Sequence, residues 1–155
     1  MSIKIDLKIF LFAIVFWLTK QIEIYMLFMI LALIHECGHL VCGVCLGLKP
    51  SNIKITPVGF QILFENYIQD YNTKIQKGNE VCIKKIAIAI AGPLINLFIA
   101  IIAFFMPQNI AVPKENLIYA NIILAIFNLL PIYPLDGGRL VKEIVTIKKR
   151  KKKGI

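Results

Sequence analysis

The sequence predicts an α-helical polytopic membrane protein, with about four transmembrane helices and a short cytoplasmic β-hairpin between helices two and three. Three observations support this fold class. The 155 residues are 58% hydrophobic and their mean hydropathy is +0.75, above the roughly 45–50% apolar content of soluble domains. The apolar residues gather into four spans. The net charge of +9 is concentrated near the C-terminal end, where the sequence KKRKKK occurs.

The four spans are predicted at about 3–18, 24–46, 86–106 and 117–136. The first has an uninterrupted apolar core of only ten residues, IFLFAIVFWL, a length also typical of the apolar part of a signal peptide. Because no small-residue cleavage pattern follows this core, we predict an uncleaved helix. Each of the other three approaches the roughly 20 residues that cross a bilayer.

Lysine and arginine residues predict the orientation of the chain. If four spans alternate from a cytoplasmic N-terminus, 16 of the 18 Lys and Arg residues fall on the cytoplasmic side, which is the side rich in these residues. We therefore expect a multi-pass protein of the cell membrane with both termini in the cytoplasm. Residues 139–155 then form a basic cytoplasmic tail. Such a tail could bind nucleic acid, but beside apolar spans we interpret it as facing the lipid bilayer, with no nucleic-acid partner.

The second span contains an H-E-x-x-H motif, formed by His35, Glu36 and His39. On a helix, two histidines one turn apart can bind one zinc ion. The adjacent carboxylate can then take a proton from a water molecule whose pKa the metal lowers to about 7. The alternative is a pair of histidines packed inside a polar bundle. Because unliganded polar groups are costly in the membrane, and because the chain has only two histidines, we interpret the motif as a metal site.

Asp136 is the candidate third ligand, since a catalytic zinc usually has three protein ligands. It is the only acidic residue of the last predicted span and lies in NLLPIYPLDGGRL, 128–140. The prolines and glycines of this stretch permit an unwound backbone, which membranes tolerate where it is buried or lines a cavity. His39 is about 10 Å from the cytoplasmic end of its span, and Asp136 is also near that end. We expect one zinc ion per chain, open towards the cytoplasm; the alternative for Asp136 is a helix-ending residue at the interface.

Three motifs resemble the site-2 protease family of intramembrane zinc metalloproteases. They are H-E-x-x-H, the Gly-Pro-x-x-Asn segment that ends at Asn96, and the Asn-x-x-Pro-x-x-Pro-Leu-Asp-Gly-Gly segment that starts at Asn128. The last is most similar to the stage IV sporulation protein FB branch. The resemblance implies that His35, His39 and Asp136 bind zinc and that Glu36 is the catalytic base. It also implies that Asn96 and Asn128 position the substrate carbonyl or its oxyanion.

Two features depart from the family pattern. The usual Asn-Pro-Asp-Gly is replaced by Pro-Leu-Asp-Gly around Asp136, a variant that the sporulation branch tolerates. Sporulation-type members also continue with further spans and a nucleotide-sensing CBS domain, so we expect a short form without that domain. This departure leaves regulation by ATP and the sporulation substrate open.

The resemblance implies an intramembrane zinc metalloendopeptidase that cleaves a membrane-tethered protein near the cytoplasmic face by attack of zinc-activated water. Residues 1–138 would form the metalloprotease core. The implied partners are the lipid bilayer, a tethered substrate such as a transcription-factor precursor, and a membrane regulatory protein. The alternative is a metal-binding membrane protein without catalysis, either a transporter or an inactive pseudoprotease partner. Glu36 favours the enzyme, because a protein that only binds metal needs no additional carboxylate beside the ligands.

Residues 52–64, NIKITPVGFQILF, predict the hairpin because they are rich in β-branched and aromatic residues around a Pro-Val-Gly turn signal. An exposed edge of the hairpin could pair with an extended substrate strand. We expect this edge at Ile53 and Ile55 or at Gln61 and Leu63, but not at both pairs. The alternative is that the hairpin only packs against the spans.

Overall fold

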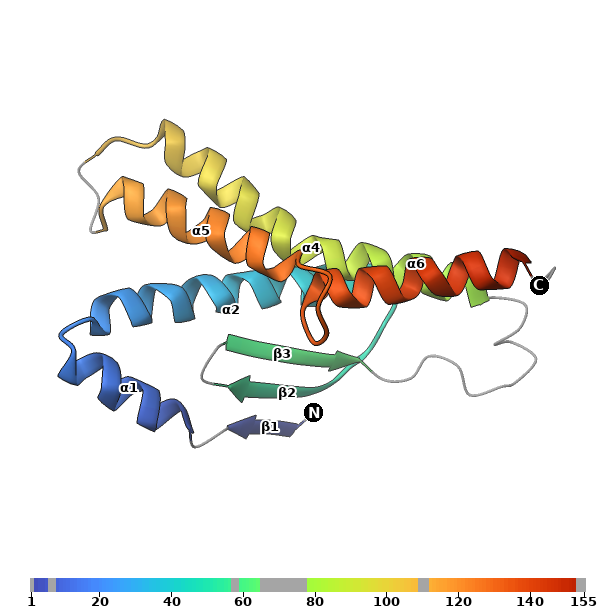
Figure 1. Cartoon of the computed structure of the whole chain (residues 1–155), viewed down its shortest axis with the longest axis horizontal. Coiled ribbons are helices and arrows are strands. Elements are labelled where there is room, and N and C mark those ends of the chain that lie inside the picture. The colour runs from blue at the N-terminus through green and yellow to red at the C-terminus, as the bar shows by residue number, and fades with distance from the viewer. Residues whose placement is uncertain (1, 6–7, 57–58, 65–77, 109–111, 153–155) are drawn as a thin grey trace.

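The computed structural model describes residues 2–5, 8–56, 59–64, 78–108 and 112–152. The protein is an elongated bundle of helices with a small sheet along one side of it (Figure 1). In chain order its elements are β1 (Ser2–Ile5), α1 (Lys8–Leu18), α2 (Ile22–Cys45), β2 (Pro50–Thr56), β3 (Gly59–Phe64), α4 (Gly78–Phe105), α5 (Lys114–Asn128) and α6 (Asp136–Lys152).

Helices α2 and α4 form the centre of the bundle. Among the described residues they are the two helices whose length and composition suffice to cross a membrane. The range of α2 agrees with the span predicted at 24–46. Helix α4 begins earlier than the span predicted at 86–106, because the helix continues through the polar residues that precede the apolar stretch. Its 28 residues rise about 42 Å, more than the hydrocarbon core requires.

The expectation of a first helical span over 3–18 is wrong. Residues Ser2–Ile5 form strand β1, in which Ile3 and Ile5 alternate with polar residues in the two-residue period of a strand. Only Lys8–Leu18 are helical. A helix of 11 residues rises about 16 Å, roughly half the hydrocarbon thickness of a bilayer.

The expectation of one continuous span over 117–136 is also wrong. Helix α5 ends at Asn128 and α6 begins at Asp136, so the two helices are separated by a non-helical connection at 129–135. Pro131 and Pro134 lack the backbone N–H groups that a helix would use. Gly137 then packs directly on the backbone carbonyl of Leu129, where a side chain would overlap it. The backbone unwinds where the prolines predict it, but Asp136 begins a helix instead of ending one.

Helix α6 runs antiparallel to the first turns of α4. Glu143 forms an ion pair with Lys85, with 3.7 Å between Oε1 and Nζ, and the Arg150 guanidinium covers Gly78 at the start of α4. The predicted basic tail is therefore helical from its first residue to Lys152 and packs on α4.

The sheet has the order β1-β2-β3. Strands β2 and β3 pair antiparallel within the stretch predicted as a hairpin, and the turn residues 57–58 lie outside the described residues. Strand β1 pairs with β2 in parallel. Because β2 is paired on both sides, the expectation that Ile53 and Ile55 could offer a free edge is wrong. The edge strands are β1 and β3, and β3 contacts α2.

Small side chains fill the interior of the bundle, while large apolar ones cover its outside. The buried apolar residues of α4 and α5 include Ala100, Ala103, Ala120 and Ala125. Phe105 on the surface is 80% exposed. Small residues let helices approach closely in a membrane, where large apolar side chains are satisfied by lipid. The packing is therefore that of helices solvated by a bilayer.

Candidate metal centre

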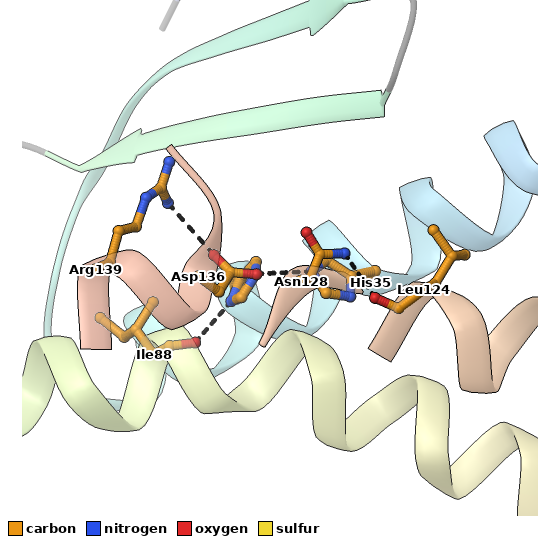
Figure 2. A network of polar contacts seen from close by, with 7 residues as sticks. His35, Ile88, Leu124, Asn128, Asp136 and Arg139 are labelled. Atoms are coloured by element: carbon orange, nitrogen blue, oxygen red, sulfur yellow. Dashed lines mark hydrogen bonds and ion pairs between the residues drawn. The ribbon is translucent and has the colours of Figure 1, made fainter. Parts of the chain in front are cut away.

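Three buried side chains from two helices meet near the middle of the bundle. His35 and His39 are one turn apart on α2, and Asp136 is the first residue of α6; none is more than 6% exposed. Oδ2 of Asp136 lies 3.0 Å from Nε2 of each histidine. The two Nε2 atoms are 3.1 Å apart. The structure therefore brings the three predicted ligands together, with one potential ligand atom from each (Figure 2).

The spacing of these three atoms fits a zinc ion. Bonds of about 2.0–2.1 Å to a tetrahedral zinc separate the ligand atoms from one another by about 3.3 Å. The observed separations of 3.0–3.1 Å are close to this value. Two imidazole nitrogens and one carboxylate oxygen are also a donor set that zinc accepts readily.

The hydrogen bond made by the other nitrogen of His39 favours a positive charge, either a metal ion or a proton, between His39 and Asp136. Nδ1 donates to the backbone carbonyl of Ile88 at 2.6 Å, because a carbonyl can only accept. In the neutral ring, Nε2 then carries a lone pair and no proton. That lone pair faces Oδ2 of Asp136, which is also an acceptor when ionised. A metal ion between them removes this repulsion, and a backbone partner for the second nitrogen is typical of metal-bound histidines.

Two glycines allow α2 and α4 to approach at this site. Gly38, between the histidines, faces the backbone of Ala91 and the side chain of Ile95. A Cβ atom on Gly92 would lie 2.5 Å from Nε2 of His39 and 2.6 Å from Nε2 of His35. Gly92 thus leaves open the space into which both ligand nitrogens point. The sequence shows this glycine only as part of its Gly-Pro-x-x-Asn segment.

Asp136 has a second charged neighbour that the sequence analysis missed. Nη1 of Arg139 is 3.7 Å from Oδ1 of Asp136, the carboxylate oxygen that does not face the histidines. Figure 2 shows the guanidinium on the side of Asp136 away from His35. Arg139 therefore restrains the carboxylate so that Oδ2 is presented to the histidines. The i, i+3 spacing at the start of a helix could have revealed this pair.

The three predicted catalytic residues differ in their burial and in their hydrogen-bond partners. Glu36 is half-buried beside His35 on α2 and lies close enough to His39 to act on its charge. Asn96 is fully buried one turn after Gly92, and neither of its amide atoms has a hydrogen-bond partner within the described residues. Nδ2 of Asn128 donates to the Leu124 carbonyl at 3.0 Å, a contact drawn in Figure 2. In the described part of the chain, no hydrogen bond joins either asparagine to the ligands.

Replacing Gly92 with alanine should abolish metal binding while leaving every ligand in place. The new methyl group would lie about where the ion has to sit, within 2.6 Å of both Nε2 atoms. Leu94→Ala is the control, because Leu94 is two residues along the same helix and is 56% exposed. Zinc per chain, measured by elemental analysis of the purified protein, should fall only in Gly92→Ala. Equal zinc in both variants would contradict the assigned position of the ion.

Replacing Arg139 with glutamine should weaken zinc binding without removing a ligand. Loss of a group that orients a ligand typically costs about 10- to 100-fold in metal affinity or activity. Lys142→Gln is the control, because Lys142 is an exposed cation on the same helix. Zinc affinity would be measured by competition with a chelator. An unchanged affinity in Arg139→Gln would exclude an orienting role for this ion pair.

Sequence comparison with known proteins also indicates a metalloprotease. Residues 23–113 and 107–154 match peptidase family M50. The chain is 29% identical over 140 residues to a zinc metalloprotease of Methanocaldococcus jannaschii, covering 86% of this chain and 36% of that protein. It is 27% identical over 127 residues to stage IV sporulation protein FB of Bacillus subtilis, covering 80% and 41%. The chain thus spans about two fifths or less of the length of these curated relatives.

The fold resembles a solved structure as well. The site-2 protease from Methanocaldococcus jannaschii superposes with a TM-score of 0.72 and 26% sequence identity, over 94% of this chain and 68% of that one. The family match and the structural match agree on the same class of membrane metalloprotease. The chain belongs to peptidase family M50, the site-2 protease family.

Proposed function

We propose that this chain is an intramembrane zinc metalloprotease that cleaves a membrane-tethered protein near the cytoplasmic face. The observation that carries the proposal is the buried cluster of His35, His39 and Asp136 with the acidic side chain of Glu36 beside it. Family membership supports hydrolysis of a peptide bond. The similarity to stage IV sporulation protein FB supports assignment to that branch, with a transcription-factor precursor as a candidate substrate and a membrane protein as a candidate regulator.

Each residue of the site has a role in this proposal. His35, His39 and Asp136 would hold one zinc ion, which when bound supplies Lewis-acid activation of water and of the peptide carbonyl. Glu36 would take the proton from the attacking water and return it to the departing amide nitrogen. Asn96 would bind the carbonyl oxygen of the substrate. This role is supported by its buried Nδ2, which has no partner among the described residues. Asn128 has one amide hydrogen left after its bond to Leu124.

The depth of the cluster supports cleavage near one face of the bilayer. His39 precedes the end of α2 at Cys45 by six residues, which is about 9 Å along the helix axis. Asp136 begins a helix that leads out along the polar start of α4. The excess of lysine and arginine on this side supports a cytoplasmic location for the cluster and for the C-terminus. The pairing of β1 with β2, which follows α2, supports the same side for the N-terminus.

The sheet offers a place for an extended substrate. A peptide bond within a helix is shielded by its own hydrogen bonds, so a tethered substrate has to be locally extended at the site of cleavage. Strand β3 is an edge strand and contacts α2, the helix that carries both histidines. Its free backbone groups could pair with a substrate strand whatever the side chains are. This supports β3, and not β2, as the strand that receives the substrate.

Replacing Glu36 with glutamine should separate metal binding from catalysis. The variant should keep its zinc, since Glu36 is not one of the three ligands, but should lose about 10²- to 10⁴-fold in cleavage rate with its general base. Asp136→Ala should instead lose zinc and activity together. Zinc content and cleavage of a tethered reporter in vesicles would be measured for both.

Undiminished cleavage in Glu36→Gln would overturn the assignment of the base, and full zinc in Asp136→Ala would place the third ligand elsewhere. Zinc binding without cleavage of any tethered reporter by the unmodified chain would favour the second candidate function, a metal-binding membrane protein without catalysis.

Proline substitutions in the edge strands should distinguish which one receives substrate. Along β3, N–H groups point alternately towards β2 and away from it, so one of Gln61 and Ile62 carries an outward N–H. Proline at that residue should impair cleavage with zinc retained, because it removes a donor from the free edge. Proline at Ile3 and at Lys4 in β1 is the matched control for the other edge. Normal cleavage in both β3 variants, or impairment confined to the β1 variants, would exclude pairing at β3.

A further inference from the structure

One face of α6 changes from apolar to basic along its length. Val141, Ile144, Val145, Lys148 and Lys152 follow the spacing i, i+3, i+4, i+7, i+11 and therefore line one face of the helix. All five are exposed, although the first three are large apolar or β-branched residues, with Val141 42% exposed and Val145 41%. The apolar half of this face is nearer to Asp136, and the basic half is nearer to the end of the helix.

The positive charge at this end is not balanced by the described residues. Among them, Lys142, Lys148, Lys149, Lys151 and Lys152 are exposed and form no ion pair. Glu143 is the one acidic residue of α6 after Asp136, and it is already paired with Lys85. The surface therefore favours a negatively charged partner.

Helix α4 shows where this surface lies relative to a bilayer. Its part without charged side chains runs from Ile86 to Phe105, a rise of about 30 Å, which equals the thickness of the hydrocarbon core. Since α4 spans the membrane in the proposed topology, the hydrocarbon boundary lies near Ile86. The pair of Lys85 with Glu143 then places Glu143 at this boundary, and the contact of Arg150 with Gly78 lies further out.

The apolar half of this face lies at the depth of the hydrocarbon edge, and the basic half lies within reach of the headgroup layer. Val141, Ile144 and Val145 are within two residues of Glu143 and so lie at the edge of the hydrocarbon. Lys148 and Lys152 are five and nine residues beyond Glu143, which is about 7–14 Å outside the hydrocarbon along the helix axis. The headgroup layer is about 5–8 Å thick on each side, and lysine side chains are long enough to reach back into it.

We propose that this face of α6 binds anionic phospholipids, with Lys148 and Lys152 at the phosphates and Val141, Ile144 and Val145 against the upper acyl chains. Apolar contact combined with lysine–phosphate attraction is the physical basis by which basic amphipathic helices bind anionic membranes. An acidic peptide would match the lysines, but it would not account for an apolar half that begins where the hydrocarbon begins. The proposal is independent of whether the chain cleaves a substrate.

To test the proposal, lipid binding by the purified full chain in detergent would be measured by native mass spectrometry. Phosphatidylglycerol and phosphatidylcholine with identical acyl chains would be added at equal concentration. We expect a preference for phosphatidylglycerol of about 30-fold, since Lys148 and Lys152 near an anionic surface contribute about 1 kcal/mol each. The double variant Lys148→Gln/Lys152→Gln should lose most of this preference. The double variant Lys20→Gln/Lys114→Gln removes the same charge from the predicted external side and should keep it.

Three results would overturn the proposal. The first is equal retention of the two lipids by the unmodified chain, and the second is an equal loss of preference in both double variants. The third is full displacement of phosphatidylglycerol by inorganic phosphate or by an acidic peptide, because a phosphate site or a peptide-binding surface would then account for the charge. Unchanged zinc content in both variants serves as the control for folding, since Lys20, Lys148 and Lys152 are exposed and Lys114 is only partly buried.

Discussion

Bringing two imidazole nitrogens and a carboxylate oxygen within 3.1 Å of one another is the constraint on which the rest of the structure depends. With Nδ1 of His39 committed to the Ile88 carbonyl, the cluster consists largely of acceptors in a buried place. Such a cluster is unfavourable without a cation. Its neighbours serve to build and hold it: Gly38 and Gly92 bring two helices together, and Arg139 restrains the carboxylate.

The bundle around the site is held by close packing of small residues more than by burial of large side chains. Alanines line the contact between α4 and α5, and the amide of Asn121 is buried there, with its Nδ2 donating to the Leu117 carbonyl at 2.8 Å. Phenylalanines and isoleucines lie outside. In a bilayer, apolar surface gains little by leaving lipid, so small residues and hydrogen bonds stabilise helix contacts instead. This arrangement lets α4 pass close to both histidines without large side chains between them.

Much of the site could be predicted because its chemistry is local in sequence. Two histidines at i and i+4 are on one helix face, and an isolated aspartate among prolines and glycines predicts the third member of the cluster. The unwound connection at 129–135 followed from Pro131 and Pro134 in the same way. The role of Gly92 could not be predicted, since it depends on which face of α4 meets α2.

The elements that were predicted wrongly depend on partners distant in the chain. Ser2–Ile5 look like the start of an apolar span until β2 supplies a neighbouring strand some 50 residues later. The sequence predicts no secondary structure for the tail after Asp136, which forms helix α6 and packs on α4. Hydropathy reports what a segment could be buried in, but it does not report which segment packs against it.

The wide separation of the ligands along the chain has a consequence for biosynthesis. His35 and Asp136 are 101 residues apart, and α4 and α5 have to be in place before their side chains can meet. A nascent chain with only its first helices inserted holds two imidazoles and no carboxylate, which is an incomplete and weak site. Capture of the ion would therefore accompany the last step of assembly, so that its binding energy stabilises only the finished bundle. If it acts as the protease proposed above, the chain would have no means of hydrolysing neighbouring membrane proteins before its last helices are in place.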